Sequence, residues 1–529
     1  MTLNIKISKL RNAAKLSQEE FAEVFGVSQQ SVQKWESGTT VPDLDKLIKI
    51  SKYFGLSLDS LVLDKTNREA EIEAEKSILP NVEIAGNWEL YSESVMQEYY
   101  QCLQEGKDIK KYRNFISAVA ELPRSNFKTR VSDSIFDLIL NLPDRPDFKY
   151  IEPSDYEKIK ALRKPYALKN MSFNKEKAYS RVYGAWLGRI IGCALGKTVE
   201  CCSPEEIKSF LKKTGNYPMH RYIYYSDLEK INPDDYRFNF KQSYYVDQFG
   251  DFTFADDDTN YTVLSQIIVE CHGREFTPYD VAGAWLSAQL RDAHCTAEKV
   301  AYINLINGYF PPDSAMYKNP YREWIGAQIR GDYFGYINPG NPEKAAEMAF
   351  KDACVSHTKN GIYGEMFVAA ALAAAGVCEN IEEIILCGLG QIPATSRFYE
   401  DITYIYKCYK SGKSCKEVLK AIHEKYTDAE NGGGVHTLPN AMIVAAALLY
   451  GEKDFGKSIC MAVETGFDTD CNAATVGSIL GMAIGVEKIP EYWKEPIKDK
   501  LETGIYRSEM VEISKCAERT LKHMEYPII

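Results

Sequence analysis

Residues 183–200 read YGAWLGRIIGCALGKTVE, and residues 464–481 read ETGFDTDCNAATVGSILG. Glycine recurs at every fourth position in and beside these stretches, at Gly184, Gly188, Gly192 and Gly196 and again at Gly477, Gly481 and Gly485. A helical glycine costs about 1 kcal/mol relative to alanine, so such a run needs a compensating contact. Because residues four apart share one helix face, we predict that these faces let helix backbones approach closely.

The chain beyond about residue 150 consists of apolar, helix-like segments separated by loops rich in Gly, Pro and Asn. Strand-like alternation is scarce, so we predict an all-α fold. The longest apolar stretches, 366–377 and 441–449, fall short of the roughly 18 residues that a membrane span needs. We therefore expect no membrane partner.

Composition narrows the class of protein. The 529 residues carry a formal net charge of −11 and include fourteen cysteines with no CxxC pair. The scattered cysteines and the lack of a signal-like apolar core at the N-terminus predict a reduced, cytoplasmic protein. The negative charge argues against a protein that coats nucleic acid, so any DNA binding must be local.

Helix start and stop signals, together with the distribution of charged residues, divide the chain into four segments. We predict a five-helix domain at 1–63, a charged linker at 64–85, a helical region of unknown role at 86–149 and a large all-helical domain at 150–529. The linker is rich in charged residues and poor in apolar ones.

The first 63 residues carry the signals of a helix-turn-helix. Ser17 followed by Glu20 predicts a capping box at the start of a helix over 18–25, which Gly26 ends. Ser28 then begins a helix over 29–36. In a helix-turn-helix the second helix enters the major groove of DNA. A small helical bundle used for protein contacts is the alternative.

Two acidic clusters stand at predicted helix starts. Asp256, Asp257 and Asp258 precede an apolar run, and Asp468 and Asp470 precede another. Carboxylates at one helix start are explained by favourable interaction with the helix dipole. Two such clusters also converge readily on cations, because packed carboxylates repel unless they are protonated or bridged by metal. Oxygen ligands favour magnesium, manganese or calcium, with two ions about 3.5–4 Å apart.

Two family resemblances follow from these motifs. YGAWLGRIIGCALGKTVE (183–200), ADDDTNYTVL (255–264) and ETGFDTDCNAATVGSILG (464–481) resemble, in order, the three signature segments of the ADP-ribosylglycohydrolase family. LSQEEFAEVFGVSQQSVQKWESGTTVPDLDKLIKISKYFGLSLDSLV (16–62) resembles the Cro/C1-type (XRE) helix-turn-helix family. The first resemblance implies an all-α fold with a binuclear metal centre and release of ADP-ribose from modified side chains or related compounds.

The first resemblance implies a set of metal ligands, which are Asp256, Asp257, Asp258, Asp468, Asp470 and Cys471. The expected cofactor is two Mg²⁺ ions, with Mn²⁺ as the alternative. The sequence departs from the family at three places: Asp256 stands at a usual Thr, Cys471 at a usual Thr or Ser ligand, and Cys193 at a common Asp. A thiol is a poor ligand for magnesium, which puts the second ion in question.

Glycosidic cleavage at ribose passes through an oxocarbenium-like state. We expect Glu200, Asp258 and Asp468 to be catalytic, with Glu200 or a bridging aspartate as general base through a water. Glu200 matches the family glutamate that lies by the substrate ribose. Further candidates for substrate binding are His357, Gly361, Tyr363, Gly433 in the glycine run 432–434, and His436. An ordinary hydrogen-bonded histidine is the alternative for each of the two histidines.

The second resemblance implies DNA contacts by Gln29, Gln30, Ser31 and Lys34, with Gln18 near a phosphate. Glutamine suits adenine in the major groove. The domain has eight Lys and Arg against seven Asp and Glu, so phosphate neutralisation adds little affinity. A homodimer would double the contacts over two half-sites of double-stranded DNA.

Three functions remain open from the sequence. The first is a metal-dependent hydrolase of ADP-ribosylated protein, or of a related ADP-ribose compound, with a DNA-binding or autoregulatory domain. The second is a transcriptional regulator that senses ADP-ribose or a nucleotide with little turnover. The third is a metal-dependent nucleoside glycosidase.

Overall fold

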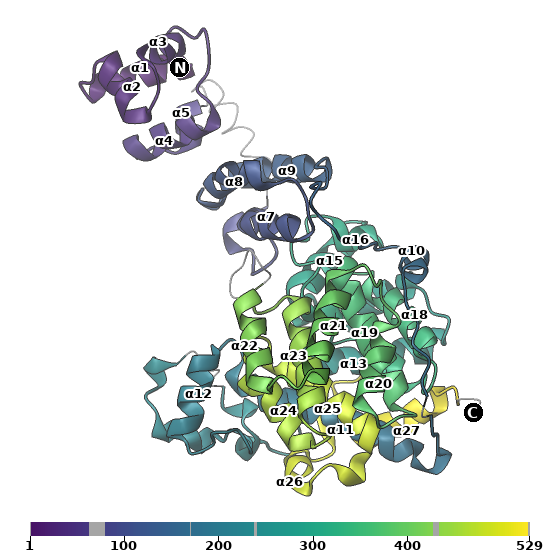
Figure 1. Cartoon of the computed structure of the whole chain (residues 1–529). Helices are drawn as coiled ribbons and strands as arrows, with labels where there is room; N and C mark the ends of the chain where they lie inside the picture. Colours follow the sequence, from purple (N-terminus) through teal and green to yellow (C-terminus); the bar gives the residue numbers. More distant parts are fainter. Residues whose placement is uncertain (1, 63–79, 170, 237–240, 427–432, 527–529) are drawn as a thin grey trace. The chain divides into compact units, whose positions relative to one another are not determined.

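The computed structural model describes residues 2–62, 80–169, 171–236, 241–426 and 433–526. Within these ranges the chain is helical, apart from one short hairpin (Figure 1), which confirms the predicted all-α class. Two units are distinguished by their internal contacts. The first comprises Met1–Tyr99 and Asp108–Pro143, and the second comprises Tyr100–Lys107 and Asp144–Ile529.

Five helices form the predicted N-terminal domain. They are α1 (Leu3–Ala13), α2 (Gln18–Phe25), α3 (Gln29–Glu36), α4 (Leu44–Phe54) and α5 (Leu58–Val62). The Ser17 capping box begins α2, and Gly26 ends it in the left-handed conformation, as the sequence predicts. Phe21, Val32 and Trp35 are buried in the small core of these helices.

The helical region after the linker contains α7 (Val95–Gln104), α8 (Arg113–Ala120) and α9 (Asn126–Leu140). Ala118, Leu122 and Phe127 pack against the core of the N-terminal helices. Residues 64–79 of the predicted linker lie outside the described residues. The four segment boundaries remain predictions.

The second unit is the large helical domain. Its helices are α10 (Tyr156–Ala161), α11 (Ala178–Gly196), α12 (Pro204–Lys213), α13 (Asp257–His272), α14 (Pro278–Ala288), α15 (Thr296–Ile306), α16 (Asp313–Met316), α17 (Asp332–Tyr336), α18 (Pro342–Ala353), α19 (Lys359–Ala375), α20 (Ile381–Leu389), α21 (Arg397–Lys410), α22 (Cys415–Lys425), α23 (Thr437–Tyr450), α24 (Phe455–Glu464), α25 (Thr469–Ile484), α26 (Glu491–Lys494) and α27 (Ile513–His523). Strands β1 (Lys500–Glu502) and β2 (Met510–Glu512) pair antiparallel. Among the described residues, no helix is both long enough and apolar enough to cross a membrane.

Helices α11 and α25 meet through their glycines and lie side by side in Figure 1. A Cβ atom placed on Gly184, Gly188 or Gly192 would lie under 3.0 Å from a backbone oxygen of α25. The same holds in reverse for Gly477 and Gly481 against α11. Only hydrogen fits at these positions, so the predicted close approach of backbones is confirmed. We refer to this contact as the glycine seam.

The glycine seam joins the C-terminal end of α11 to the N-terminal end of α25. A Cβ atom on Gly196 would lie under 3.0 Å from the backbone nitrogen of Asp470. The Thr469 hydroxyl donates to the Gly196 carbonyl at 2.9 Å. A short 3-10 helix, η5 (Lys197–Val199), follows α11 and leads to Glu200. The seam thus fixes Lys197 and Glu200 beside Asp468 and Asp470.

A Gly188→Ala substitution should destabilise the large domain, because its methyl group would overlap the backbone of α25. Overpacking of a rigid core costs roughly 1–3 kcal/mol or more. Gly283 in α14 is the matched control, since a Cβ atom there meets nothing within 4 Å. Gly283→Ala should be neutral or stabilising by up to about 1 kcal/mol. Urea unfolding of both variants checks this, and equal stabilities would contradict the seam.

Candidate metal and active site

Three helix ends bring the acidic side chains together. Asp256 is the N-cap of α13, where its carboxylate accepts a hydrogen bond from the Asp258 backbone N–H at 3.1 Å. Asp468 is the N-cap of α25, yet its side chain makes no capping hydrogen bond. Asp470 lies in the first turn of α25, and Glu200 follows η5. The two acidic clusters of the sequence therefore converge, as predicted.

Lys197 lies in the middle of this cluster. Its ammonium nitrogen is 2.7 Å from Glu200 Oε2, 2.9 Å from Asp256 Oδ2 and 3.0 Å from Asp470 Oδ2. Burial favours the neutral amine, but Asp470, Asp256 and Glu200 outweigh it and raise the pKa of Lys197 well above its ordinary value. The lysine is therefore a fixed cation inside the cluster.

A second cation, Arg189, holds Asp258 from the opposite side. Its guanidinium donates to Asp258 Oδ1 at 2.9 Å and to the Asp258 carbonyl at 2.8 Å. The same group also pairs with Asp332 at 3.2 Å. All three side chains are buried. Arg189 therefore fixes the orientation of Asp258 while sharing its charge with a second carboxylate.

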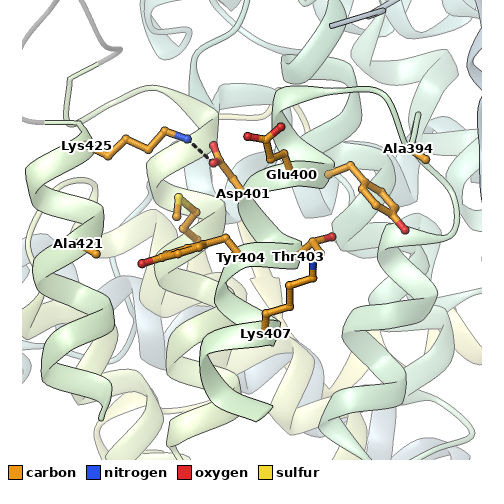
Figure 2. A pocket seen from close by; sticks show the side chains of 10 residues that line it. Ala394, Glu400, Asp401, Thr403, Tyr404, Lys407, Ala421 and Lys425 are labelled. Carbon is orange, nitrogen blue, oxygen red and sulfur yellow. Dashed lines mark hydrogen bonds and ion pairs between the residues drawn. The ribbon is translucent and has the colours of Figure 1, made fainter. Parts of the chain in front are cut away.

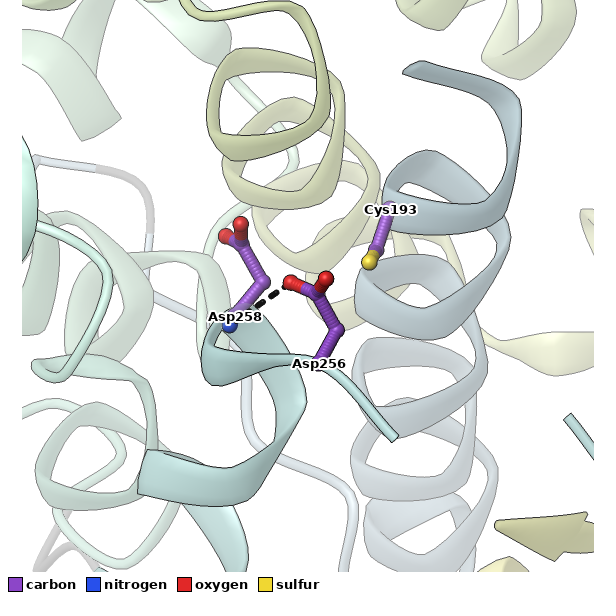
Figure 3. Close-up of side chains that lie close together, drawn as sticks. All are labelled: Cys193, Asp256 and Asp258. Carbon is purple, nitrogen blue, oxygen red and sulfur yellow. Dashed lines mark hydrogen bonds between the residues drawn. The ribbon is translucent and has the colours of Figure 1, made fainter. Parts of the chain in front are cut away.

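Two groups of donor atoms are close enough to hold a cation. One joins Cys193, Asp256 and Asp258, which Figure 3 shows with their side chains converging. The other joins Asp258, Asp470 and Cys471. Asp470 Oδ1 is buried and has no hydrogen-bond partner among the described residues. Buried polar atoms normally have a partner, and a bound cation would supply one for this oxygen. The carboxylates therefore fit a divalent ion.

The two thiols fit such an ion less well. Burial and the neighbouring carboxylates raise the pKa values of Cys193 and Cys471 well above the ordinary thiol value. Cys471 Sγ instead donates a hydrogen bond to Asp258 Oδ2 at 3.2 Å. A protonated thiol is a weak ligand for Mg²⁺ or Mn²⁺. Metal ligation by Cys471 therefore remains a prediction, and the carboxylates are the better donors.

The excess of buried negative charge appears in the pKa values. Burial and repulsion between carboxylates raise the pKa of Asp257 and Asp468 well above the ordinary range. The pKa of Asp258 is raised likewise, despite Arg189. Burial and the charge of Asp470 raise the pKa of Glu200 to about 7. Lys197 and Arg189 thus compensate only part of the cluster.

A cleft of about 750 Å³ opens beside the carboxylates. Glu200 and Asp468 line it, together with Gly434 and Phe467. The Phe467 ring stacks on His423 with a centroid distance of 4.5 Å and an interplanar angle of 13°. Phe467 has a φ of 61°, an unusual value for a residue with a side chain. The cleft thus combines an acidic end with an aromatic wall.

The other predicted substrate-binding residues lie in varied surroundings. Gly361, in α19, packs against the Arg322 carbonyl and the ring of His357, which is buried and bonded to Ser356 at 2.8 Å. The Tyr363 hydroxyl donates to the Pro153 carbonyl at 2.5 Å. These contacts are those of packed core residues, and their role in substrate binding stays a prediction.

The segment before α23 borders the cleft. His436 is the N-cap of α23, and its Nδ1 accepts from the Leu438 backbone N–H at 3.2 Å. Gly433 has a φ of 59° and open space where a side chain would be. It adjoins Gly434, which lines the cleft, whereas residue 432 lies outside the described residues. Gly433 therefore remains the best placed of these substrate candidates.

Sequence reasoning missed four residues of this region. Lys197 and Arg189 lie inside the quoted motif, and a cation among apolar and small residues is the signal that marks each one. The pair formed by Phe467 and His423 joins residues from distant segments. No local sequence pattern predicts a contact between such distant residues.

A separate cavity of about 550 Å³ lies between α21 and α22 (Figure 2). Lys425 forms an ion pair with Asp401 at its edge. None of the predicted site residues lines it. It therefore has no part in the acidic site.

Helix α3 of the first unit carries the predicted DNA contacts. Gln29, Gln30 and Lys34 are exposed, and Ser31 is half-buried with its hydroxyl 2.9 Å from that of Ser28. Gln18, at the start of α2, donates from its side-chain amide to Glu36 at 2.6 Å. The exposed side chains of α3 are thus free to reach a groove, whereas Gln18 is already engaged.

Comparison with known proteins gives a family for most of the large domain and for the N-terminal helices. A family model for ADP-ribosylglycohydrolases matches residues 174–525, and a helix-turn-helix model matches residues 7–61. These matches confirm both resemblances. A solved structure titled ADP-ribosylglycohydrolase-related protein complex aligns with 66% of this chain and 100% of its own, at 17% identity and a TM-score of 0.38.

Two transcription regulators are similar to the N-terminal part. The HTH-type transcriptional activator BcrR of Enterococcus faecalis is 40% identical over 62 residues, which are 12% of this chain and 30% of BcrR. The cryptic phage CTXphi transcriptional repressor RstR of Vibrio cholerae is 30% identical over 107 residues, which are 20% of this chain and 94% of RstR. The chain thus spans about a third of the first regulator and nearly all of the second.

Without added metal, the stability of the large domain should fall as the pH rises. A carboxylate whose pKa is raised by folding stabilises the fold below its ordinary pKa and loses that contribution as the pH rises through the raised value. For Glu200 this window runs from 4.5 to about 7. Chelator-treated protein should therefore show a falling midpoint of thermal unfolding across that range. In the Glu200→Gln variant the unfolding midpoint should change less with pH. The exposed control Glu229→Gln should keep the pH dependence of the wild-type chain.

Proposed function

The chain belongs to the ADP-ribosylglycohydrolase family, and on that premise we propose that it releases ADP-ribose from ADP-ribosylated protein or a related compound. It is a glycosidic hydrolase fused to a helix-turn-helix domain. The observation that carries the proposal is the buried carboxylate cluster, which reaches the 750 Å³ cleft through Glu200 and Asp468. Glycosidic cleavage uses carboxylates beside the sugar, because its transition state is oxocarbenium-like.

The proposed cofactor is a divalent cation, Mg²⁺ or Mn²⁺, held by Asp257, Asp258, Asp468 and Asp470. The orphaned oxygen of Asp470 and the raised pKa values of the other three support it. When bound, such a cation supplies positive charge that orients ribose hydroxyls. The sequence predicts two ions, and the position of Lys197 bears directly on that number.

Glu200 is the proposed general base. Its pKa of about 7 lets it exchange a proton at neutral pH, and its carboxylate lies on the cleft wall beside Asp468. A water between Glu200 and the ribose would lose its proton to Glu200 as it attacks C1'. The ion pair with Lys197 holds the carboxylate in place at 2.7 Å. As the glycosidic bond breaks, its electron pair leaves with the departing group, which takes up a proton from water, and Asp258 and Asp468 would stabilise the positive charge on the sugar.

The cleft walls suit the rest of an ADP-ribose group. The ring of Phe467, supported by His423, offers a flat aromatic surface for a nucleobase. Lys420 lines the same cleft and supplies a cation that attracts a diphosphate. Gly433 and Gly434 present backbone groups at the border of the cleft without side chains in the way.

An Asp468→Asn variant should lose ADP-ribose release. Removing one group that stabilises the transition state typically lowers the rate by roughly 10²–10³-fold. Release of ADP-ribose from ADP-ribosylated protein with Mg²⁺ or Mn²⁺, and after chelation, is the measurement. The exposed Asp313→Asn is the matched control and should retain full activity.

Several outcomes would contradict the assignment. Release that survives chelation would overturn metal dependence. Metal-dependent cleavage of free nucleosides with no release from protein would indicate a nucleoside glycosidase. Tight ADP-ribose binding without release would indicate a regulator that senses the ligand.

The N-terminal domain is proposed to bind double-stranded DNA through α3, with Gln29, Gln30, Ser31 and Lys34 in the major groove. Similarity to two transcription regulators supports this role. A homodimer on two half-sites would compensate for the low net charge of the domain. The cytoplasm, where DNA and reduced cysteines coincide, is the proposed location; all fourteen cysteines are free thiols.

A double Gln29→Ala/Gln30→Ala variant should bind its own promoter DNA more weakly. Each bidentate contact to a base contributes about 1–3 kcal/mol, which corresponds to a loss of roughly tenfold or more in affinity. Gel-shift titration at fixed salt measures the change. Asn12→Ala, an exposed amide on α1, is the control. If both variants bound the DNA with equal affinity, the assignment of α3 as the recognition helix would be wrong.

A further inference from the structure

Lys197 reaches the carboxylate cluster from a fixed backbone. Residue 196 is pressed against the start of α25 by the glycine seam, and the Thr469 hydroxyl holds its carbonyl at 2.9 Å. The Lys197 side chain is only 11% exposed, and its ammonium touches three carboxylates. It is therefore built into the cluster, in contrast to a surface lysine that folds over it.

The ammonium lies among three carboxylate oxygens, one of them from Asp256, which also belongs to the donor group with Cys193 and Asp258. Its three partners, Glu200 Oε2, Asp256 Oδ2 and Asp470 Oδ2, surround it at 2.7–3.0 Å. A divalent ion bound by these oxygens would need the same volume, since its bonds to oxygen are about 2.0–2.6 Å long. Lysine and metal therefore exclude each other at this position.

In the donor group of Asp258, Asp470 and Cys471, Arg189 engages Asp258 Oδ1 and Lys197 engages Asp470 Oδ2, which leaves the second oxygen of each carboxylate. Asp470 Oδ1 is buried and has no hydrogen-bond partner among the described residues, whereas Lys197 pairs with Oδ2. It belongs to the donor group formed with Asp258 and Cys471, whose ligand atoms lie within 4.8 Å of one another. The Asp258 oxygen on this side receives only a thiol hydrogen bond. One cation fits here without displacing a charged side chain.

We propose that this chain binds a single divalent cation, between Asp258 and Asp470 in the donor group that they form with Cys471, and that the Lys197 ammonium permanently replaces a second one. The inference rests on the proposed function, because it concerns the same carboxylates. It replaces the two ions expected from the sequence by one ion and one ammonium group. The lysine supplies one positive charge in place of two and offers no exchangeable ligand position.

The test is the number of Mn²⁺ ions bound by the full chain. Equilibrium dialysis gives the stoichiometry, and electron paramagnetic resonance distinguishes an isolated Mn²⁺ from a spin-coupled pair about 3.5–4 Å apart. The wild-type chain should bind one tight Mn²⁺ with an isolated-ion spectrum. Lys197→Met, which keeps the length but removes the charge, should bind two ions with a coupled spectrum.

Control variants keep the test decisive. Lys344→Met removes a half-buried lysine that pairs with Glu275 and Glu347 away from the cluster, and it should still bind one ion. Lys197→Gln is the second variant should Lys197→Met fail to fold, as judged by circular dichroism. Two coupled ions in the wild-type chain, no tight ion, or a single ion in both folded Lys197 variants would overturn the inference.

The inferred number of bound ions and the proposed activity can each be contradicted without the other. One bound Mn²⁺ without ADP-ribose release would leave the inference standing and contradict the hydrolase. Release of ADP-ribose by a chain that binds two ions would support the hydrolase and contradict the inference. The stoichiometry is therefore informative whichever substrate the enzyme takes.

Discussion

The contact between the backbones of α11 and α25 is the constraint on which the rest of the large domain depends. Glycines at the points of closest contact carry no side chain, so the helix axes approach until backbone meets backbone. That approach fixes the end of one helix against the start of the other. Lys197 and Glu200 come directly after α11, and Asp468 and Asp470 stand at the start of α25. The acidic site forms because these two helix ends meet.

Charge balance is the second requirement that this geometry creates. Six carboxylates, those of residues 200, 256–258, 468 and 470, gather near two cations, Lys197 and Arg189. Buried charges of one sign are tolerated only when they are paired, protonated or bound to an ion. The remaining negative charge favours a cation, and Asp470 Oδ1, which has no hydrogen-bond partner among the described residues, is available to bind it.

The sequence predicted much of this arrangement because its signals are local. Capping residues located α2 and α3, glycine spacing identified the seam, and acidic clusters at helix starts located carboxylates that the fold brings together. It did not predict that Lys197 would enter the cluster, since a lysine at a helix end usually points to solvent. The stacking of Phe467 on His423 was also beyond reach, because it joins segments that only the tertiary fold brings together.

The carboxylates of the site come from segments around residues 200, 257 and 469, so the unfolded chain contains no binding site for an ion. A cation held there binds the native state alone and stabilises it by about 2.7 kcal/mol when its concentration is 100 times its dissociation constant. The supply of metal in a cell would then govern how long each molecule escapes proteolysis, as well as how fast it works. Abundance of the attached DNA-binding domain would follow the same supply.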